Sequence, residues 1–389
     1  MTDSTASDLE DPYAEIRPFS SPDVPQVLTR LANDAGLAAA SALRRLPRLS
    51  AMWPGLARRL GSLWLHLAAR RLSTVEDLQN LIAPNLSRMI KKTSRFSVGG
   101  MERLNLEPAR VYLSNHRDIF MDPAYANYAF HRQGSRTLAV AIGDNLLSKP
   151  WVADLMRLNK SFVVKRDVGG PRALLAATKL LSQFIRDAVS QNREAIWIAH
   201  REGRAKDGRD VTAPAVIQMR TLSRERGELP ESVLSELDIV PLVIAYELDP
   251  CDALKAAELT AGEGYVKSEF EDVASIAQGI VGDKGCVHLH FGEPLPPGLQ
   301  VKEVVAEIDR QMALHYRLYR TNVWAWEWLH GAPAPEGLLF HEGSISEQSF
   351  RTRVDSIAPE HQQWMLAMYA NPVDRQLALQ AASRDSSCD

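Results

Sequence analysis

The sequence predicts an α/β fold in which a central, mostly parallel sheet is flanked by helices and preceded by a helical region. Two observations lead to this class. Between residues 96 and 320, short apolar runs alternate with helical stretches, and strands that are regularly separated by helices favour a parallel sheet. Before residue 96, leucines recur three or four positions apart, which is the period of an amphipathic helix.

Composition limits the classes of protein and partner that need to be considered. The 389 residues are 45% hydrophobic and 24% charged, as in ordinary folded proteins, and no uncharged apolar run approaches the roughly 20 residues of a membrane-spanning helix. The net charge of −3 gives no general attraction to nucleic acid, so we expect no such partner. Three widely separated cysteines without metal-ligand spacing are typical of reduced thiols in a cytoplasmic protein.

The chain divides into four expected segments. These are an acidic flexible tail at 1–22, a basic amphipathic helical region at 23–95, an α/β domain at 96–320 and a helical or irregular extension at 321–389. From Arg30 to Arg95 there are 12 cations and only 3 anions, together with Trp53 and Trp64. Such a composition suits a helical region that lies in a membrane interface. The alternative is a subdomain packed on the core with solvated arginines.

Within the α/β domain, apolar runs and helical periods alternate in order. The expected strands cover residues 110–115, 137–143, 161–166, 195–200, 239–247 and 286–292. The expected helices cover about residues 123–132, 145–158, 171–190, 212–224, 268–281 and 301–319. In open sheets of this class, binding sites gather beyond the carboxyl ends of the strands.

Polar residues follow the first four expected strands. They are His116-Arg117-Asp118, Gly143-Asp144-Asn145, Lys165-Arg166-Asp167 and His200 to Arg204. A histidine held by a carboxylate can deprotonate a hydroxyl, and lysine and arginine bind phosphate. No serine or cysteine stands in a recognisable nucleophile setting, which favours direct attack by an acceptor hydroxyl. Taken singly, each residue could also be a solvated or hydrogen-bonded surface group.

Two aspartates are candidates to orient His116. Asp122 precedes Pro123, which is also a helix-start signal with aspartate as N-cap and proline at the first helical position. Asp118 lies only two residues from His116 and would need a tight local turn to reach the ring. We therefore expect Asp122 to be the partner, with Asp118 as the alternative.

The order of these motifs resembles the glycerolipid acyltransferases, the family of glycerol-3-phosphate and lysophosphatidate acyltransferases. Their first motif, a histidine and an aspartate with four residues between, is similar to "SNHRDIFMD", where five residues separate His116 from Asp122. The later motifs are similar to "AIGDNLLSKPWVADLMRLNKSFVVKRD", "WIAHREGRAKDGRD", "IVPLVIAYE" and "VHLHFGEPLPP". The resemblance covers about residues 100–300.

This resemblance implies an O-acyltransferase of phospholipid biosynthesis that moves a fatty acyl group from an acyl thioester to a hydroxyl of glycerol-3-phosphate. It assigns catalysis to His116 and Asp122. The remaining motif positions are Lys165, Arg166, Arg201 and Arg204 for substrate phosphate, and Asn145, Glu202, Gly203 and Pro241 for support. Two registers of the third motif leave the roles of Glu202 and Arg204 open. The resemblance implies no metal and no cofactor, with acyl-CoA or acyl carrier protein as co-substrate.

Alternatives remain for the acceptor and for the class of function. Lysophosphatidate or another lysolipid is the alternative acceptor, and a catalytically inert lipid- or carrier-binding protein of the same fold is the alternative from another class. We expect a cytoplasmic protein that is peripheral on the inner face of the plasma membrane through its basic N-terminal helices. The remaining aromatic features are expected to be structural: His288, His290, Trp324, Trp326 and Trp328.

Overall fold

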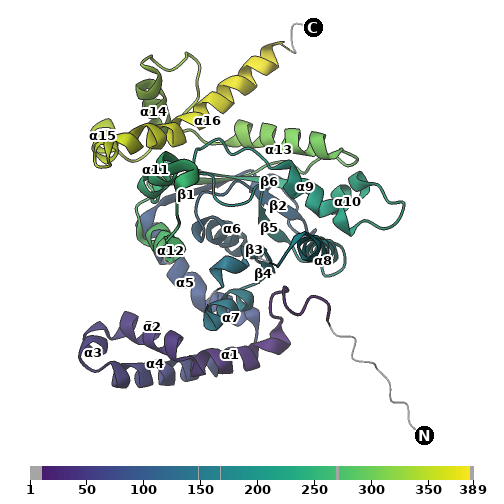
Figure 1. Cartoon of the computed structure of the whole chain (residues 1–389), viewed down its shortest axis with the longest axis vertical. Helices are drawn as coiled ribbons and strands as arrows, with labels where there is room; N and C mark the ends of the chain where they lie inside the picture. Colours follow the sequence, from purple (N-terminus) through teal and green to yellow (C-terminus); the bar gives the residue numbers. More distant parts are fainter. Residues whose placement is uncertain (1–10, 148, 167, 269–270, 386–389) are drawn as a thin grey trace. The chain divides into compact units, whose positions relative to one another are not determined.

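A computed structural model of the chain describes residues 11–147, 149–166, 168–268 and 271–385. Seven strands form one sheet in the order β1-β7-β6-β2-β5-β3-β4 (Figure 1). The pairs β1–β7, β2–β5, β2–β6 and β3–β4 are parallel, and β6–β7 is antiparallel. The predicted α/β class with a mostly parallel sheet is confirmed. Residues 1–10 of the predicted tail at 1–22, together with Asp167 and Cys388, lie outside the described residues.

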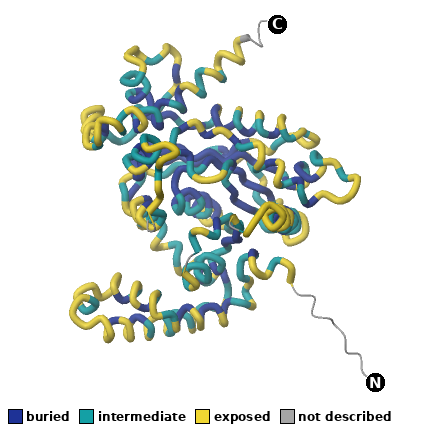
Figure 2. The backbone as a smooth tube through the Cα atoms, viewed as in Figure 1, coloured by how far each residue is buried: buried dark blue, intermediate teal, exposed yellow. Residues whose placement is uncertain are grey.

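Six of the seven strands lie where apolar runs predict them. The strands are β1 (Arg95–Gly99), β2 (Val111–Ser114), β3 (Ala139–Gly143), β4 (Ser161–Val164), β5 (Ile196–Ala199), β6 (Val240–Tyr246) and β7 (Cys286–Phe291). Every residue of β2 and β6 is buried, so these central strands read as continuous apolar runs (Figure 2). Strand β1 was not predicted, because its five residues are mostly half-buried and follow directly on a helix.

Sixteen α-helices are described. They are α1 (Val24–Asn33), α2 (Ala35–Arg45), α3 (Pro47–Met52), α4 (Pro54–Ala69), α5 (Val75–Thr93), α6 (Met121–Arg132), α7 (Pro150–Leu158), α8 (Pro171–Ser190), α9 (Pro214–Arg220), α10 (Pro230–Glu236), α11 (Asp252–Ala261), α12 (Glu271–Val281), α13 (Val301–His315), α14 (Arg320–His330), α15 (Glu347–Asp355) and α16 (Pro359–Asp385). Helices α10 and α11 were not predicted. The chain separates into two compact units, residues 1–83 with 139–184 and residues 84–138 with 185–389.

The first unit contains a helical hairpin with an unusual distribution of side chains. Helices α2 and α4 pack through small buried residues, Ala38 and Ala42 against Ala57 and Gly61. A Cβ atom on Gly61 would lie 2.3 Å from the carbonyl oxygen of Ala38, so the two backbones are in close contact. The large apolar side chains therefore lie on the outside of the hairpin.

A separate apolar cluster in the first unit joins α1 to α5 and α7. Its buried members include Val27 and Leu31 of α1, Leu78 of α5 and Leu158 of α7. The bidentate ion pair between Arg30 and Asp154 lies beside this cluster, with both nitrogen–oxygen distances at 2.9 Å. These contacts place α1 firmly within the unit, and α4 of the hairpin packs against α1, where the hydroxyl of Ser62 donates to the carbonyl oxygen of Ala32 at 3.1 Å.

In the second unit, the C-terminal extension has its own apolar cluster. Phe350, Met365 and Tyr369 are buried there, and the three tryptophans of "VWAWEWLHG" pack partly buried against them. The tryptophans lie on α14, so they are distributed around a helix and do not share one face of a strand. Core packing therefore accounts for this aromatic run, as expected.

Candidate active site

The geometry of His116 is set by the loop between β2 and α6. His116 follows the end of β2, and Asp122 lies in the first turn of α6. Nδ1 of His116 is 2.9 Å from Oδ2 of Asp122, so the extra residue in the motif is accommodated in the loop. The Asp122 side chain is 1% exposed and that of His116 is 15% exposed, which leaves one edge of the pair accessible.

Asp122 is held by further hydrogen-bond donors. The backbone N–H groups of Arg117 and Asp118 donate to its Oδ2 at 2.5 and 2.9 Å, and the hydroxyl of Tyr246 donates to Oδ1 at 2.7 Å. Hydrogen bonds to a carboxylate are among the strong ones in proteins. Because both oxygens are occupied, the carboxylate cannot rotate away from His116. Burial, with Asp122 next in effect, raises the pKa of Tyr246 well above its ordinary value, so the tyrosine keeps its proton.

Asp118 has a different place in the same loop. Its Oδ1 accepts hydrogen bonds from the backbone N–H groups of Phe120 and Met121 at 3.0 and 2.8 Å, which caps the start of α6. The alternative reading of Asp122 as an N-cap does not apply, because α6 begins at Met121 and Asp122 already lies inside it. Burial and the neighbouring Asp122 raise the pKa of Asp118 to about 6.

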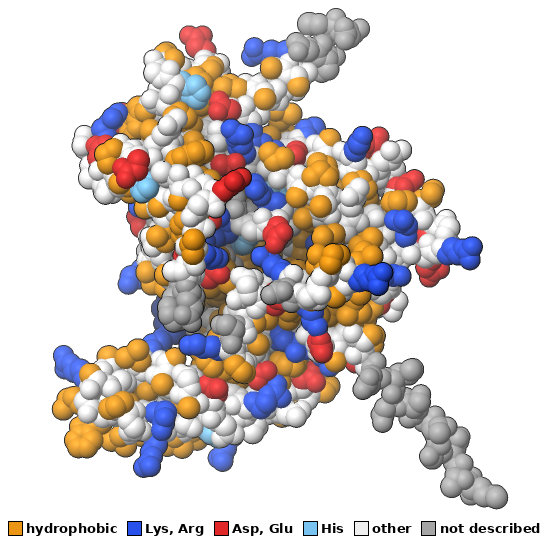
Figure 3. Space-filling view, in the orientation of Figure 1, with side chains coloured by type: hydrophobic (Ala, Val, Ile, Leu, Met, Phe, Trp, Pro, Cys, Tyr) orange, Lys and Arg blue, Asp and Glu red, His pale blue; other side chains and the backbone are white. Residues whose placement is uncertain are grey.

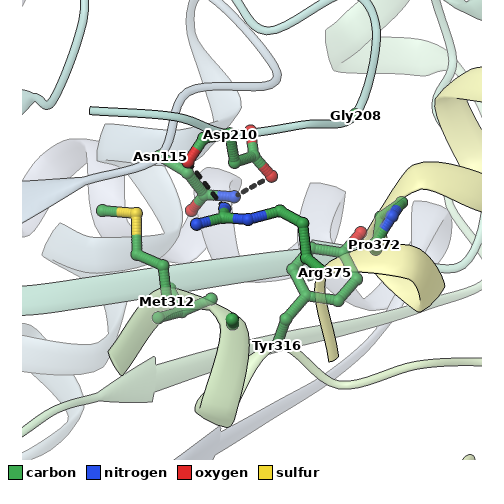
Figure 4. A pocket seen from close by; sticks show the side chains of 9 residues that line it. Asn115, Gly208, Asp210, Met312, Tyr316, Pro372 and Arg375 are labelled. Carbon is green, nitrogen blue, oxygen red and sulfur yellow. Dashed lines mark hydrogen bonds between the residues drawn. The ribbon is translucent and has the colours of Figure 1, made fainter. Parts of the chain in front are cut away.

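The buried carboxylate of Asp210 holds the two residues that flank His116. Oδ2 of Asp210 accepts hydrogen bonds from the side chains of Asn115 and Arg117, at 3.1 and 2.6 Å. These residues flank His116 in the sequence. Although burial pushes the pKa of Asp210 upward, Arg117 and His200 hold it below its ordinary value. Figure 4 shows Asp210 between Asn115 and Arg375 at the wall of a small pocket.

The loop of the third motif lies against the first. The backbone N–H of Ala205 donates to the carbonyl oxygen of His116 at 2.7 Å, which brings the adjacent Arg204 into the neighbourhood of the pair. Arg201 and Arg204 are half-buried, whereas Glu202 and Gly203 are exposed. Gly203 has a φ of 71°, a conformation that glycine adopts without steric penalty.

The histidine at the end of β5 belongs to the core. His200 is fully buried, and its Nδ1 lies 3.1 Å from the hydroxyl of Thr212. Burial lowers the pKa of His200 to about 3, so the ring is neutral at physiological pH. Two histidines follow strands of the sheet, His116 after β2 and His200 after β5. Of these two, only His116 has an accessible side chain.

The residues of the second motif lie in the first unit. Asn145 and Arg166 flank Gly143, where a Cβ atom would meet Oδ1 of Asn145 at 2.5 Å and Nε of Arg166 at 3.0 Å. Lys165 forms an ion pair with the exposed side chain of Glu15. The structure thus gathers Asn145 and Arg166 around one glycine and directs Lys165 toward the N-terminal segment.

The remaining predicted residues are structural in position. Pro241 lies in β6, in register with Leu113 of β2. His288 lies 2.8 Å from the hydroxyl of Ser97, and His290 stacks on His315. Within the described part of the chain, no group of three His, Cys, Asp or Glu side chains could hold a metal ion.

Three supporting residues were missed because they are distant in sequence. Tyr246, Asp210 and Lys255 lie 124, 93 and 138 residues from the first-motif residues that they contact. Asp210 closes the "WIAHREGRAKDGRD" segment and Tyr246 lies within "IVPLVIAYE", so both motifs carried a signal that was not used.

The arrangement suits general-base chemistry. Since Nδ1 of His116 is bound to a carboxylate, Nε2 is the ring nitrogen that can accept a proton from a substrate. The ring of Trp197 lies edge-on to the imidazole, with centroids 5.5 Å apart, and restricts its orientation. A histidine fixed in this way can remove a proton from a hydroxyl and later return it to a leaving group.

Comparison with known proteins gives a match to one family model and similarity to solved structures. A family model described as "Acyltransferase" matches residues 95–243. Among solved structures, the 1-acyl-sn-glycerophosphate (LPA) acyltransferase PlsC from Thermotoga maritima is similar, with a TM-score of 0.36 and 14% identity over 61% of this chain and 78% of that chain. No curated protein matched the chain significantly. The matched segment contains the first three motifs and Pro241 of the fourth, so the family match agrees with the resemblance that these motifs indicated.

Proposed function

We propose that the protein transfers a fatty acyl group from an acyl thioester to a hydroxyl of glycerol-3-phosphate, with His116 as general base and Asp122 as its orienting partner. One observation carries this proposal: an accessible histidine bound at 2.9 Å to a carboxylate that is held by three further donors. This pair lies within the segment that matches the acyltransferase family.

The proposed reaction needs only the two substrates. Nε2 of His116 takes the proton of the acceptor hydroxyl while the hydroxyl oxygen attacks the thioester carbonyl carbon. Collapse of the tetrahedral intermediate breaks the carbon–sulfur bond, and the protonated His116 returns its proton to the leaving thiolate. The products are an ester and a free thiol, so atoms and charges balance. General-base catalysis typically contributes about 10²–10⁴-fold.

The acceptor phosphate is proposed to bind the cations of the third motif, Arg201 and Arg204, and arginine can bind phosphate oxygens bidentately. Lys165 and Arg166 of the second motif, in the first unit, are proposed separately as phosphate ligands. The proximity of Arg204 to the His116 loop supports its place in this set. Asn145, Glu202, Gly203 and Pro241 are proposed to support the two loops. Acyl-CoA and acyl carrier protein are both proposed donors.

A panel of acceptors tests the proposal and its closest alternative. Purified protein is incubated with a labelled acyl thioester and glycerol-3-phosphate, lysophosphatidate or a neutral lysolipid. Turnover with glycerol-3-phosphate and its loss in His116→Ala are expected. Faster turnover with lysophosphatidate would favour the alternative acceptor. Binding of lipid or carrier without turnover on any acceptor would favour an inert binding protein of the same fold.

We further propose that the α2–α4 hairpin contacts the inner face of the plasma membrane. Leu56, Leu60, Leu63 and Leu67 follow one face of α4 and are between 40% and 56% exposed. Small residues inside and large apolar residues outside are the opposite of the pattern in water-soluble helical pairs and match packing in lipid. Among described residues, no helix is long and apolar enough to cross a bilayer. We propose an interfacial contact, in which the apolar face of α4 lies at the membrane surface.

The hairpin also carries exposed arginines. Arg44, Arg45, Arg48, Arg58 and Arg59 are exposed on the hairpin, and Figure 3 shows cationic side chains beside hydrophobic ones there. Each cation near an anionic membrane surface contributes about 1 kcal/mol. The wild-type protein is expected to sediment with anionic vesicles, whereas the Leu60→Glu/Leu63→Glu variant is expected to stay in the supernatant. Val266→Glu/Leu339→Glu, which alters two apolar residues outside the hairpin, is the matched control. Equal sedimentation of all three proteins would contradict the proposal.

A further inference from the structure

Lys255 is a fully buried cation that contacts the His116 loop. It lies on α11, is 1% exposed, and was not part of any sequence motif. Its Nζ donates one hydrogen bond to the carbonyl oxygen of Arg117 at 2.6 Å and another to Oδ2 of Asp249 at 2.5 Å. A buried lysine is costly unless its charge is paired, and Asp249 supplies that pairing.

The carbonyl that Lys255 binds belongs to a peptide unit whose N–H also makes a hydrogen bond in the site. The same peptide, between Arg117 and Asp118, presents its N–H to Oδ2 of Asp122 at 2.9 Å. That oxygen is also the one bound to Nδ1 of His116, again at 2.9 Å. An unbroken chain of hydrogen bonds therefore runs from the Lys255 ammonium through one peptide unit and Asp122 to the imidazole.

We propose that Lys255 is a positioning residue for acyl transfer, which acts on the His116–Asp122 pair through the peptide between Arg117 and Asp118. The peptide is planar, so fixing its carbonyl also fixes the direction of its N–H. A cation on the carbonyl oxygen polarises the peptide and strengthens the hydrogen bond that its N–H donates to Asp122. Both effects hold the carboxylate in the position that His116 requires.

The surroundings of Lys255 keep the ammonium in place. Asp249 accepts a hydrogen bond from the backbone N–H of Cys251 through Oδ1 at 2.8 Å, and its own backbone N–H donates to the hydroxyl of Tyr369 at 2.9 Å. Tyr369 lies on α16, in the C-terminal extension beyond the family match. The extension thus braces the anion that holds Lys255, which links it to the site.

A second buried lysine shows that burial alone does not create this link. Lys284 is 0% exposed, and its Nζ donates to the carbonyl oxygen of Gly282 at 2.8 Å and to the hydroxyl of Thr93 at 3.3 Å. Neither hydrogen bond reaches the peptide between Arg117 and Asp118, although the charge of Lys284 acts on Asp118 and Asp249. Lys284→Met is therefore the matched control for the removal of a buried lysine.

The experiment compares full-length wild type, Lys255→Met, Lys255→Met/Asp249→Asn and Lys284→Met. The double variant removes the ion pair as a unit, which avoids an unpaired buried carboxylate and is often tolerated. The inference rests on the proposed function, so two readouts are combined. The first is kcat and KM with acyl-CoA and the accepted acceptor, and the second is the proton NMR resonance of the His116 Nδ1–H group, which requires no turnover.

Both Lys255 variants are expected to lose about tenfold in kcat with little change in KM, since general-base catalysis rather than binding is impaired. The Nδ1–H resonance should move upfield in both, and Lys284→Met should match wild type in kcat and resonance. Wild-type kcat in either folded Lys255 variant, an unmoved resonance, or failure of the double variant to fold would overturn the inference. Absence of turnover in wild type would refute the proposed function instead, and the resonance would still test the link.

Discussion

Asp118 offers a quantitative test of the electrostatics behind the His116 loop. Burial, followed by the neighbouring Asp122, raises its pKa from 3.8 to about 6. A shift of about two pKa units corresponds to about 3 kcal/mol at 1.36 kcal/mol per unit. Between pH 3.8 and 6 the native state holds a proton that the unfolded state has released. The contribution of Asp118 to the free energy of unfolding therefore falls as the pH rises through this window.

Asp118→Asn removes this titration but keeps the Oδ1 acceptor that caps α6. The variant should gain stability relative to wild type as the pH rises from about 4 to 7, by up to about 3 kcal/mol. Urea unfolding at several pH values measures the difference, and Asp355→Asn, at an exposed aspartate of α15, is the control. A difference between Asp118→Asn and wild type that stays constant over this range would refute the reasoning.

Four further outcomes test other parts of the structure. Asp122→Asn should lose about 10²–10⁴-fold in kcat while it keeps the wild-type fold, whereas Asp118→Asn should keep near-normal kcat. If Asp118→Asn lost more kcat than Asp122→Asn, Asp118 would be the partner of His116. Tyr246→Phe removes one donor to Asp122 and should cost about tenfold in kcat, while Tyr125→Phe, whose hydroxyl bonds Ser94, serves as the control. Burial lowers the pKa of His288 to about 3. Its contribution to the free energy of unfolding is therefore present above pH 6.5 and is lost as the pH falls toward 3. If urea unfolding showed the same loss of stability in acid for His288→Gln as for wild type, this reasoning would be contradicted. Gly61→Val places a Cβ atom 2.3 Å from the carbonyl oxygen of Ala38 and should lower Tm, which an unchanged melting curve would disprove.

Local sequence patterns were sufficient for much of the fold. The apolar runs of β2 to β7 are short and bounded by polar residues, and their alternation with helices indicated a parallel sheet without knowledge of strand order. Strand β1 was missed because only pairing with β7, from Arg95 opposite Cys286 onward, identifies it as a strand. Helices α10 and α11 were missed because seven and ten residues give little periodicity.

The sequence by itself determined the α/β class, the resemblance to the acyltransferases and the candidates His116 and Asp122, because these depend on residues that are close together in the chain. Only the tertiary structure decided that Asp122 binds His116 while Asp118 caps α6, since the path of the loop determines both. It alone brought in Tyr246 and Lys255. Their contacts with the first motif span 124 and 138 residues, and the packing of β6 and α11 beside β2 and its loop, rather than any local pattern, creates them.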